Sequence, residues 1–236
     1  MNKYLQKYVE HCQEFDNNKF MIVLDRDLIA VFAGTDYLNI GEKTAEDVIG
    51  KHIHKTAKIP PENIQPSLKA FNKSITNNQV VPVLITNLLH KTKDLIKIFG
   101  ATIYPICEPN TDFVVGLRFE FYFIKLETFF EILIKNVTHV EKNNLPDNES
   151  FLTHREHQIA FLLFYCKGYS EVAKVISIFE NTNITEKTIR NIVSRYLYPK
   201  FNVYNLQMLI ENLRNNDYHL KMPASLQTNR FIDLSI

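Results

Sequence analysis

Signals that start and end helices divide the stretch from residue 152 to residue 202, and they constrain the fold more than any other feature. Thr153 is followed three residues later by Glu156, which is the pattern of a capping box at a helix N-terminus. Apolar residues recur at helical spacing up to Cys166, and Gly168 is expected to end this helix because glycine is favoured just past a helix C-terminus. The stretch therefore predicts a bundle of short helices.

Three more helices are expected after the first. Ser170 is expected to cap the second helix and Thr185 the third, since Ser and Thr side chains accept hydrogen bonds from the first free backbone amides. The third helix is predicted over residues 186–198 and is expected to stop at Pro199, which has no backbone N–H to donate. A fourth helix is predicted at about residues 204–214.

The third helix has two contrasting faces. Its predicted buried stripe is apolar and consists of Ile189, Ile192, Val193, Tyr196 and Leu197. The opposite face carries cations, an amide and hydroxyls: Lys187, Thr188, Arg190, Asn191, Ser194 and Arg195. Arginine and asparagine can form paired hydrogen bonds to guanine and adenine in the major groove, so this face suits DNA recognition. A solvated face of an ordinary helical bundle has a similar composition, so that alternative stays open.

The charge distribution weakly supports a nucleic-acid partner for this part of the chain. The whole chain of 236 residues has a formal net charge of +1. Residues 151–214 carry 8 Lys+Arg against 5 Asp+Glu, whereas residues 1–150 carry 17 against 19. The positive end of the molecule therefore coincides with the predicted helices.

The first 125 residues predict an antiparallel sheet with helices inserted between its strands. Strands are expected at residues 20–24, 28–33, 80–89, 95–106 and 113–125, and helices at 2–15, 44–49 and from about 61 to 75. Few polar residues separate the first two strands, which predicts a hairpin, and short turns join the last three into a meander. Gly50 is expected to end the helix that Thr44 begins.

A further amphipathic helix is predicted directly after the last strand, over Leu126 to Val137. Periodicity alone does not distinguish a helix that packs on its own sheet from one that forms a signalling or dimer contact. The polar residues 139–150 after it predict a linker between two domains.

The order of elements in residues 20–125 resembles a PAS domain. The residues that carry this resemblance are FMIVLDRDLIAVFAG, then EKTAEDVIGKHI, then the three-strand finish. The turn at Asp25–Asp27 departs from the pattern because it lacks the glycine often found between these strands. The resemblance implies a sensor domain that binds a small molecule or a protein partner, and an exit helix that commonly transmits the signal.

Residues 152–213 resemble the LuxR/FixJ-type helix-turn-helix. Leu152-Thr153-His154-Arg155-Glu156 is similar to the LTxRE opening of that family, and Lys167-Gly168-Tyr169-Ser170 is similar to the G-x-S step that follows it. Ile184 to Asn191 resembles the start of the recognition helix, and Tyr196 to Val203 its exit. The resemblance implies base contacts by Arg190, Asn191 and Ser194 and backbone contacts by Lys187, Thr188 and Arg195.

Two departures from the helix-turn-helix pattern bear on DNA docking. The segment from Ser170 to Ile184 is several residues longer than in the family, which predicts an extended turn at residues 179–183. Ile192 stands where the family usually has a histidine near the phosphates. Both departures could alter docking or lower the affinity for DNA.

The predicted fold class is α+β, with a PAS-like five-stranded antiparallel sheet domain followed by an all-α four-helix LuxR-type domain. The expected domains are a sensor and dimerisation domain over residues 1–138, a linker over 139–150, a DNA-binding domain over 151–214 and a C-terminal tail over 215–236. The tail contains enough apolar residues to pack against another surface, but its sequence does not indicate which surface that is.

Candidate sites in the sensor are apolar. Its interior positions Phe99, Ile103, Phe119, Phe121 and Phe123 either line a ligand cavity or fill a core, and packed strand faces are the norm. His52 and His54 are interpreted as surface histidines, since no third metal ligand accompanies them, and the three cysteines as reduced thiols. Without catalytic motifs, no enzymatic activity, cofactor or metal is expected.

The sequence thus predicts a bacterial transcription regulator that binds double-stranded DNA as a homodimer, under control of a small-molecule or protein signal. A protein-interaction module that keeps the helix-turn-helix scaffold without sequence-specific DNA binding is the alternative. The N-terminus has no signal peptide and no window has about 18 apolar residues, so a cytoplasmic protein without membrane association is expected.

Overall fold

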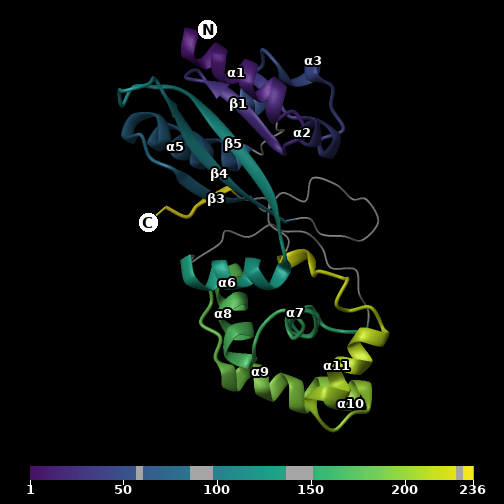
Figure 1. The fold of residues 1–236 in the computed structure, drawn as a ribbon. Helices are drawn as coiled ribbons and strands as arrows, with labels where there is room; N and C mark the ends of the chain where they lie inside the picture. The colour runs from purple at the N-terminus through teal and green to yellow at the C-terminus, as the bar shows by residue number, and fades with distance from the viewer. Residues whose placement is uncertain (57–60, 86–97, 137–150, 227–230, 236) are drawn as a thin grey trace. The chain divides into compact units, whose positions relative to one another are not determined.

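A computed structural model describes residues 1–56, 61–85, 98–136, 151–226 and 231–235, and all structural statements below concern these residues. The chain divides into two compact units. We call the first the sheet unit; it comprises residues 1–89, 99–123 and 229–236. We call the second the helical unit, and it includes residues 124–228. The chain therefore leaves the sheet unit after its fifth strand and returns to it near the C-terminus (Figure 1).

The sheet unit is built on a six-stranded sheet with the order β2-β1-β5-β4-β3-β6. Its strands are β1 (Met21–Asp25), β2 (Ala30–Ala33), β3 (Val81–Ile85), β4 (Ile98–Cys107), β5 (Val114–Ile124) and β6 (Phe231–Asp233). Strand β1 pairs antiparallel with β2 and β5, and β3 pairs antiparallel with β4 and β6. Its helices are α1 (Lys3–Phe15), α2 (Thr35–Ile40), α3 (Ala45–Val48), α4 (Ile53–Thr56) and α5 (Pro61–Asn77).

Both faces of the central strands are covered. Alternate residues of a strand point to opposite faces, and β1 is buried on each side. Met21 and Val23 pack with Leu5, Val9 and other residues of α1 in one apolar cluster. The other face of β1 contributes to a larger cluster with β5, β4 and α5. This second cluster is the main core of the sheet unit.

The helical unit contains the elements that were predicted to bind DNA. All the elements of the helical unit are α6 (Leu126–Asn136), α7 (His154–Leu162), α8 (Tyr169–Glu180), α9 (Glu186–Ile192), a π-helical turn η1 (Val193–Leu197), α10 (Tyr198–Phe201), α11 (Leu206–Asn215) and a 3₁₀ turn η2 (Ala224–Leu226), as far as the structure describes the chain. In the described part of the chain, no helix has the length and apolar character needed to cross a membrane.

Several sequence predictions are confirmed at the level of single elements. The N-terminal helix, the first hairpin and the meander of the last three strands form at the predicted places. Thr44 caps the helix that it was predicted to begin, in a capping box with Asp47, and Gly50 follows with a φ of 78°, a conformation that favours glycine. Ser170 does not cap α8, because Gly168 occupies the N-cap position.

The sheet has one strand more than the five that were predicted. The added strand β6 comes from the C-terminal tail and lies at the sheet edge beside β3. The expected tail over residues 215–236 is thus divided, since residues 229–236 belong to the sheet unit. The predicted linker over residues 139–150 lies outside the described residues.

Helix α6 packs against other elements of the helical unit. Its buried residues are Phe129, Phe130 and Leu133, and the Phe130 ring lies 6.5 Å from Phe161 and 6.3 Å from Tyr165 between centroids. The sequence placed this helix in the sensor domain, up to residue 138, and left open whether it packed on the sheet. The contacts instead group it with the helices that follow.

The close approach of β5 to its neighbours gives a test of the sheet unit's packing. A Cβ at Gly116 would lie 2.6 Å from the carbonyl oxygen of Leu24 and 2.8 Å from Cδ1 of Leu5. Gly116→Ala is therefore expected to lower the free energy of unfolding by about 1–3 kcal/mol, as overpacking does. Chemical denaturation of the purified chain measures this.

Gly168→Ala is the matched control for that substitution. No atom lies within 4 Å of a Cβ built at Gly168, so the change is expected to alter the unfolding free energy by less than about 0.5 kcal/mol. Equal effects of the two substitutions would contradict the packing described for β5.

Candidate nucleic-acid interface

The six polar side chains predicted to contact DNA are all exposed, and they come from α9 and the start of η1. They are Lys187, Thr188, Arg190, Asn191, Ser194 and Arg195. Behind them Ile189, Val193 and Leu197 are buried at intervals of four residues. Thr185 caps α9, as predicted, because its side chain accepts a hydrogen bond from the Thr188 amide at 3.2 Å. The buried stripe holds the polar face toward solvent.

The helix that carries this face continues through Pro199, so the prediction that Pro199 ends it was wrong. In an α-helix the ring of Pro199 would press on the carbonyl of Arg195. The π-helical turn η1 widens the helix just before that point, and the Tyr198 amide donates to the carbonyl of Val193, five residues earlier. The run ends at Asn202, which is left-handed with a φ of 51°.

The π-helical turn also changes which residues are buried. An added residue in one turn rotates the helix surface relative to regular α-helical spacing. Tyr196, which was predicted to lie in the buried stripe, is 54% exposed. Ile192 is partly buried and thus lies at the border of the polar face.

Arg190 is the most constrained cation of the exposed face. Its Nη2 donates to Oε1 of Glu186 at 2.7 Å, and its guanidinium carbon lies 5.4 Å from the centroid of the Tyr169 ring. Burial and a hydrogen bond with Tyr198 raise the pKa of Tyr169 to about 12. Lys187 and Arg195 make no ion pair with any residue that the structure describes.

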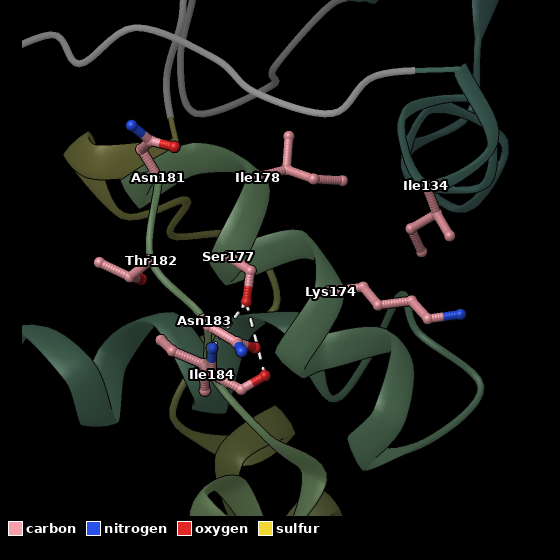
Figure 2. Close-up of a pocket in the computed structure, with 8 residues that line it drawn as sticks. All are labelled: Ile134, Lys174, Ser177, Ile178, Asn181, Thr182, Asn183 and Ile184. Carbon is pink, nitrogen blue, oxygen red and sulfur yellow. Dashed lines mark hydrogen bonds between the residues drawn. The ribbon is translucent and has the colours of Figure 1, made fainter.

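The turn before α9 is fixed by a single hydroxyl. Helix α8 ends at Glu180 and is followed by Asn181 in the left-handed conformation, with a φ of 52°. Ser177 Oγ donates to the carbonyl of Ala173 at 2.8 Å and accepts from the amide of Ile184 at 3.0 Å (Figure 2). The predicted extended turn at residues 179–183 was wrong in its bounds, because Phe179 and Glu180 belong to α8 and the turn covers residues 181–184.

A groove of about 590 Å³ lies beside this turn. Figure 2 shows the eight residues that line it: Ile134, Lys174, Ser177, Ile178, Asn181, Thr182, Asn183 and Ile184. Ile134 belongs to α6, and the others belong to α8 and the turn. Helix α6 therefore contacts the helix-turn-helix next to the turn that positions α9.

An ion pair between a buried carboxylate and a partly exposed lysine joins the beginning of α7 to the end of the helix that carries the exposed face. Lys200 Nζ lies 2.6 Å from Oε2 of Glu156, whose side chain is 6% exposed. The same oxygen accepts from the Thr153 amide at 2.7 Å, which completes the predicted capping box. Burial would raise the pKa of Glu156, but the hydrogen bonds from Lys200 and Thr153 outweigh it and hold that pKa below its ordinary value.

Part of the C-terminal tail docks on α7. His157 Nε2 lies 3.0 Å from the carbonyl oxygen of Lys221, and Gln158 Nε2 donates to Ser225 Oγ at 2.9 Å. Gln158 also donates to Glu180 of α8 at 2.8 Å, and Leu226 is fully buried. Residues up to 226 thus belong to the packing of the helical unit.

The five predicted ligand-binding positions of the sensor lie together in the sheet unit. Ile103 and Phe119 belong to the main core cluster, and Phe121 packs against it. Ring centroids are 4.3 Å apart for Phe119 and Phe121 and 5.0 Å apart for Phe99 and Phe123. Phe123 is 56% exposed, so this aromatic group extends from the core to the surface.

The histidines and cysteines show no sign of a metal site in the residues the structure covers. The rings of His52 and His54 lie 4.8 Å apart, and His54 Nε2 is 3.0 Å from Ser67 Oγ. Burial lowers the pKa of His54. Cys12, Cys107 and Cys166 are free thiols.

The sheet unit and the helical unit together define a class of protein: a PAS-like α+β sensor fold followed by a helix-turn-helix fold. No family model matches the sequence, and no curated protein does. Solved structures match over nearly the whole chain. A phage VqmA–DPO complex matches with 16% identity and a TM-score of 0.56, covering 99% of each chain.

The Vibrio cholerae VqmA–ligand–DNA complex matches with 20% identity and a TM-score of 0.51, covering 98% of this chain and 96% of that one. The PAS domain of Bordetella pertussis BvgS matches 52% of this chain and 88% of its own, with 13% identity and a TM-score of 0.42. At these identities the likeness shows the fold. The chain has the fold of the VqmA structures, and the predicted α+β fold class is confirmed.

The Glu156–Lys200 pair gives a pH-dependent prediction. Folding lowers the pKa of Glu156. The ionised carboxylate therefore stabilises the folded chain at neutral pH, and this stabilisation is lost as the pH falls through the pKa of Glu156 in the folded state. Glu156→Gln is expected to lower the free energy of unfolding at pH 7 by about 1–3 kcal/mol. The difference in unfolding free energy between Glu156→Gln and the wild type should shrink below about pH 4.3, the ordinary pKa of glutamate. Denaturant unfolding between pH 7 and pH 3 measures it.

The exposed pair between Lys167 and Glu131 serves as the control, since its Nζ–Oε1 distance is also 2.6 Å. Glu131→Gln is expected to leave stability unchanged, because solvent screens exposed ion pairs. If the difference in unfolding free energy between Glu156→Gln and the wild type did not change with pH, the role assigned to Glu156 would be contradicted.

Proposed function

We propose that this chain is a DNA-binding transcription regulator in which the sheet unit senses a signal and the helical unit binds double-stranded DNA. The observation that carries this proposal is the exposed face of α9 and η1. Six side chains capable of contacting bases or phosphates project from one helix, while Ile189, Val193 and Leu197 fix its rotation. The Vibrio cholerae VqmA structure with DNA and ligand shares this fold and supports the proposal.

The side chains divide into two roles in this proposal. Arg190 and Asn191 suit guanine and adenine, because each can form two hydrogen bonds to a base edge, and Ser194 lies one turn further along. Lys187, Thr188 and Arg195 flank them and suit phosphates, which need only a nearby cation or hydroxyl. A net charge of +3 over residues 151–214 favours approach to DNA.

We expect the chain to act as a homodimer on DNA. One short recognition helix contacts too few bases for specific affinity, and paired half-sites one helical turn apart supply the rest. A palindromic operator follows from this arrangement, because a two-fold symmetric dimer contacts the same sequence twice.

A protein-interaction module without sequence-specific DNA binding is the second candidate. The exposure of Tyr196 favours it, since exposed aromatic residues are enriched in protein interfaces. The dependence of binding on salt separates the two functions. Binding to DNA weakens steeply with added salt through counterion release, whereas a mainly apolar protein interface changes little.

Substitutions in the Arg190–Glu186 pair test the DNA-binding face. Arg190→Ala is expected to weaken binding to a selected operator at least about fivefold, since a lost bidentate base contact costs about 1–3 kcal/mol. Glu186→Gln should instead strengthen binding a few fold, because it removes a negative charge beside the proposed DNA contacts while the glutamine amide oxygen can still accept the hydrogen bond from Arg190. Titration of labelled DNA at fixed salt, with the operator obtained by selection from random sequence, measures both.

Arg26→Ala is the matched control, because it removes the same charge from an exposed turn of the sheet unit. It is expected to leave the affinity for DNA within twofold of the wild type. Unchanged affinity in Arg190→Ala, with circular dichroism equal to that of the wild type, would rule out α9 as the recognition helix.

We further propose that the aromatic group of the sheet unit binds the signal. Phe99, Phe119, Phe121 and Phe123 connect the main core to the surface, so a small apolar or aromatic ligand would contact both. Ile103 lies in the same cluster. DPO, which is bound in the VqmA structures, is the first probe to use.

A ligand at this group predicts a stability change that depends on one ring. DPO at a hundredfold excess over its Kd should stabilise the wild-type chain by about 2.7 kcal/mol, which raises its melting temperature. Phe121→Leu, at a partly buried position, is expected to reduce that rise by at least half. Calorimetry with and without DPO measures the rise in melting temperature. If the rise were equal in the wild type and Phe121→Leu, the ligand would bind elsewhere.

A further inference from the structure

The edge of the sheet at β3 is occupied by a short strand from the far end of the chain. Residues Phe231, Ile232 and Asp233 of β6 lie opposite Ile85, Leu84 and Val83 of β3. The pairing continues beyond the strand, because the Leu234 amide donates to the carbonyl of Pro82 at 2.9 Å. Such addition of a strand to a sheet edge is a common mode of peptide recognition.

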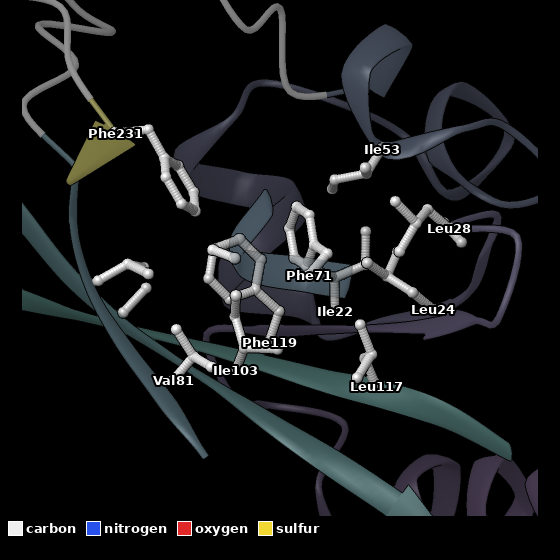
Figure 3. Packing of buried hydrophobic residues seen from close by; sticks show 14 of the residues in the cluster. Ile22, Leu24, Leu28, Ile53, Phe71, Val81, Ile103, Leu117, Phe119 and Phe231 are labelled. Carbon is white, nitrogen blue, oxygen red and sulfur yellow. The ribbon is translucent and has the colours of Figure 1, made fainter. Parts of the chain in front are cut away.

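Every second residue of this segment has a specific partner on or beside α5. The Phe231 ring is 7% exposed and lies 6.1 Å from Phe71 and 6.4 Å from Phe119 between centroids (Figure 3). The Phe231 amide donates to the side-chain oxygen of Asn63 at 3.1 Å, and Asn63 is buried. The first position therefore accepts a large aromatic ring.

The next two alternate positions share one cation. Lys73 Nζ lies 3.6 Å from a carboxylate oxygen of Asp233 and donates to both the carbonyl and the hydroxyl oxygen of Ser235 at 2.7 Å. A groove of about 520 Å³ runs alongside, lined by α5 together with Asp233 and Ser235. Because strand side chains alternate, Phe231, Asp233 and Ser235 face α5 together.

The attachment is short in comparison with the rest of the sheet. Strand β6 pairs three residues with β3, whereas β3 pairs five residues with β4. Within residues 231–235, Phe231 supplies the one buried side chain, and Ile232 to Ser235 are partly exposed. Short edge elements with a single buried anchor open at lower free energy than the whole domain.

We propose that the groove between β3 and α5 is a strand-binding site for the chain's own residues 231–235, and that these residues dock reversibly as a latch. The helical unit lies between β5 and β6 along the chain. The docked latch thus connects the helical unit to the sheet unit at both of its ends, and the released latch leaves one connection. A free segment on the same chain returns readily, because its effective concentration at the groove is high.

Peptide binding to the full-length protein tests the site. A fluorescent peptide of residues 229–236 is expected to bind the full-length Phe231→Ser variant, whose groove is vacated, at least tenfold more tightly than the wild type. A peptide with Phe231→Ser should not bind, whereas a peptide with Ile232→Thr, changed on the opposite face, should bind within threefold of the original. Adding Lys73→Met to the variant should weaken binding at least fivefold.

Equal binding of the peptide to the wild type and the Phe231→Ser variant would overturn the proposal, and so would equal loss from the two peptide substitutions. Hydrogen exchange on the unaltered chain tests reversibility without any variant. The Leu234 amide is expected to exchange at least a hundredfold faster than the amides of β4, and equal rates would show a permanent strand. Neither experiment uses DNA. A negative result in either one would therefore not contradict the proposed DNA-binding function, and a failure to bind DNA would not change the results expected here.

Discussion

The buried carboxylate of Glu156 is the interaction on which the geometry of the helical unit depends. It caps α7 through the Thr153 amide and pairs with Lys200 at the far end of the helix that begins at Glu186. A buried charge left without its partner is strongly destabilising, so the pair excludes arrangements in which these two helix ends separate. Together with the buried Ile189 stripe, it fixes both the position and the rotation of the exposed face.

Local patterns made the helix starts of this unit predictable. A capping box depends on residues three apart, so the sequence around Thr153 and Thr44 contained all the information needed. The expectation at Pro199 followed an equally local rule and was wrong. Proline ends a regular α-helix, but the π-helical turn at Val193–Leu197 removes the clash that the rule assumes. The exposure of Tyr196 has the same origin.

Contacts between distant segments were not predictable from periodicity. The apolar stripe of α6 showed that one face is buried, but its partners Phe161 and Tyr165 lie on another part of the chain. Strand β6 is too short for a pattern to emerge, and Phe231 contacts Asn63, which is 168 positions away. The alternation of Phe231, Asp233 and Ser235 acquires meaning only when Lys73 and the β3 edge are known.

The exposed face of α9 also gives a physical reason for the proposed division into base-contacting and phosphate-contacting residues. Arg190 lies over the Tyr169 ring and is held by Glu186, so its guanidinium is oriented before DNA arrives. An exposed ion pair of this kind is worth less than about 1 kcal/mol, so a base can displace the carboxylate at small cost.

A side chain that is already oriented loses less entropy on binding, and directional hydrogen bonds to a base edge benefit most from that. Lys187 and Arg195, which make no ion pair with the residues described, keep their rotamer freedom. Phosphates tolerate such freedom, because an attraction between charges depends on distance more than on direction. The constraint on Arg190 therefore supports its assignment to base recognition on physical grounds that are independent of any resemblance.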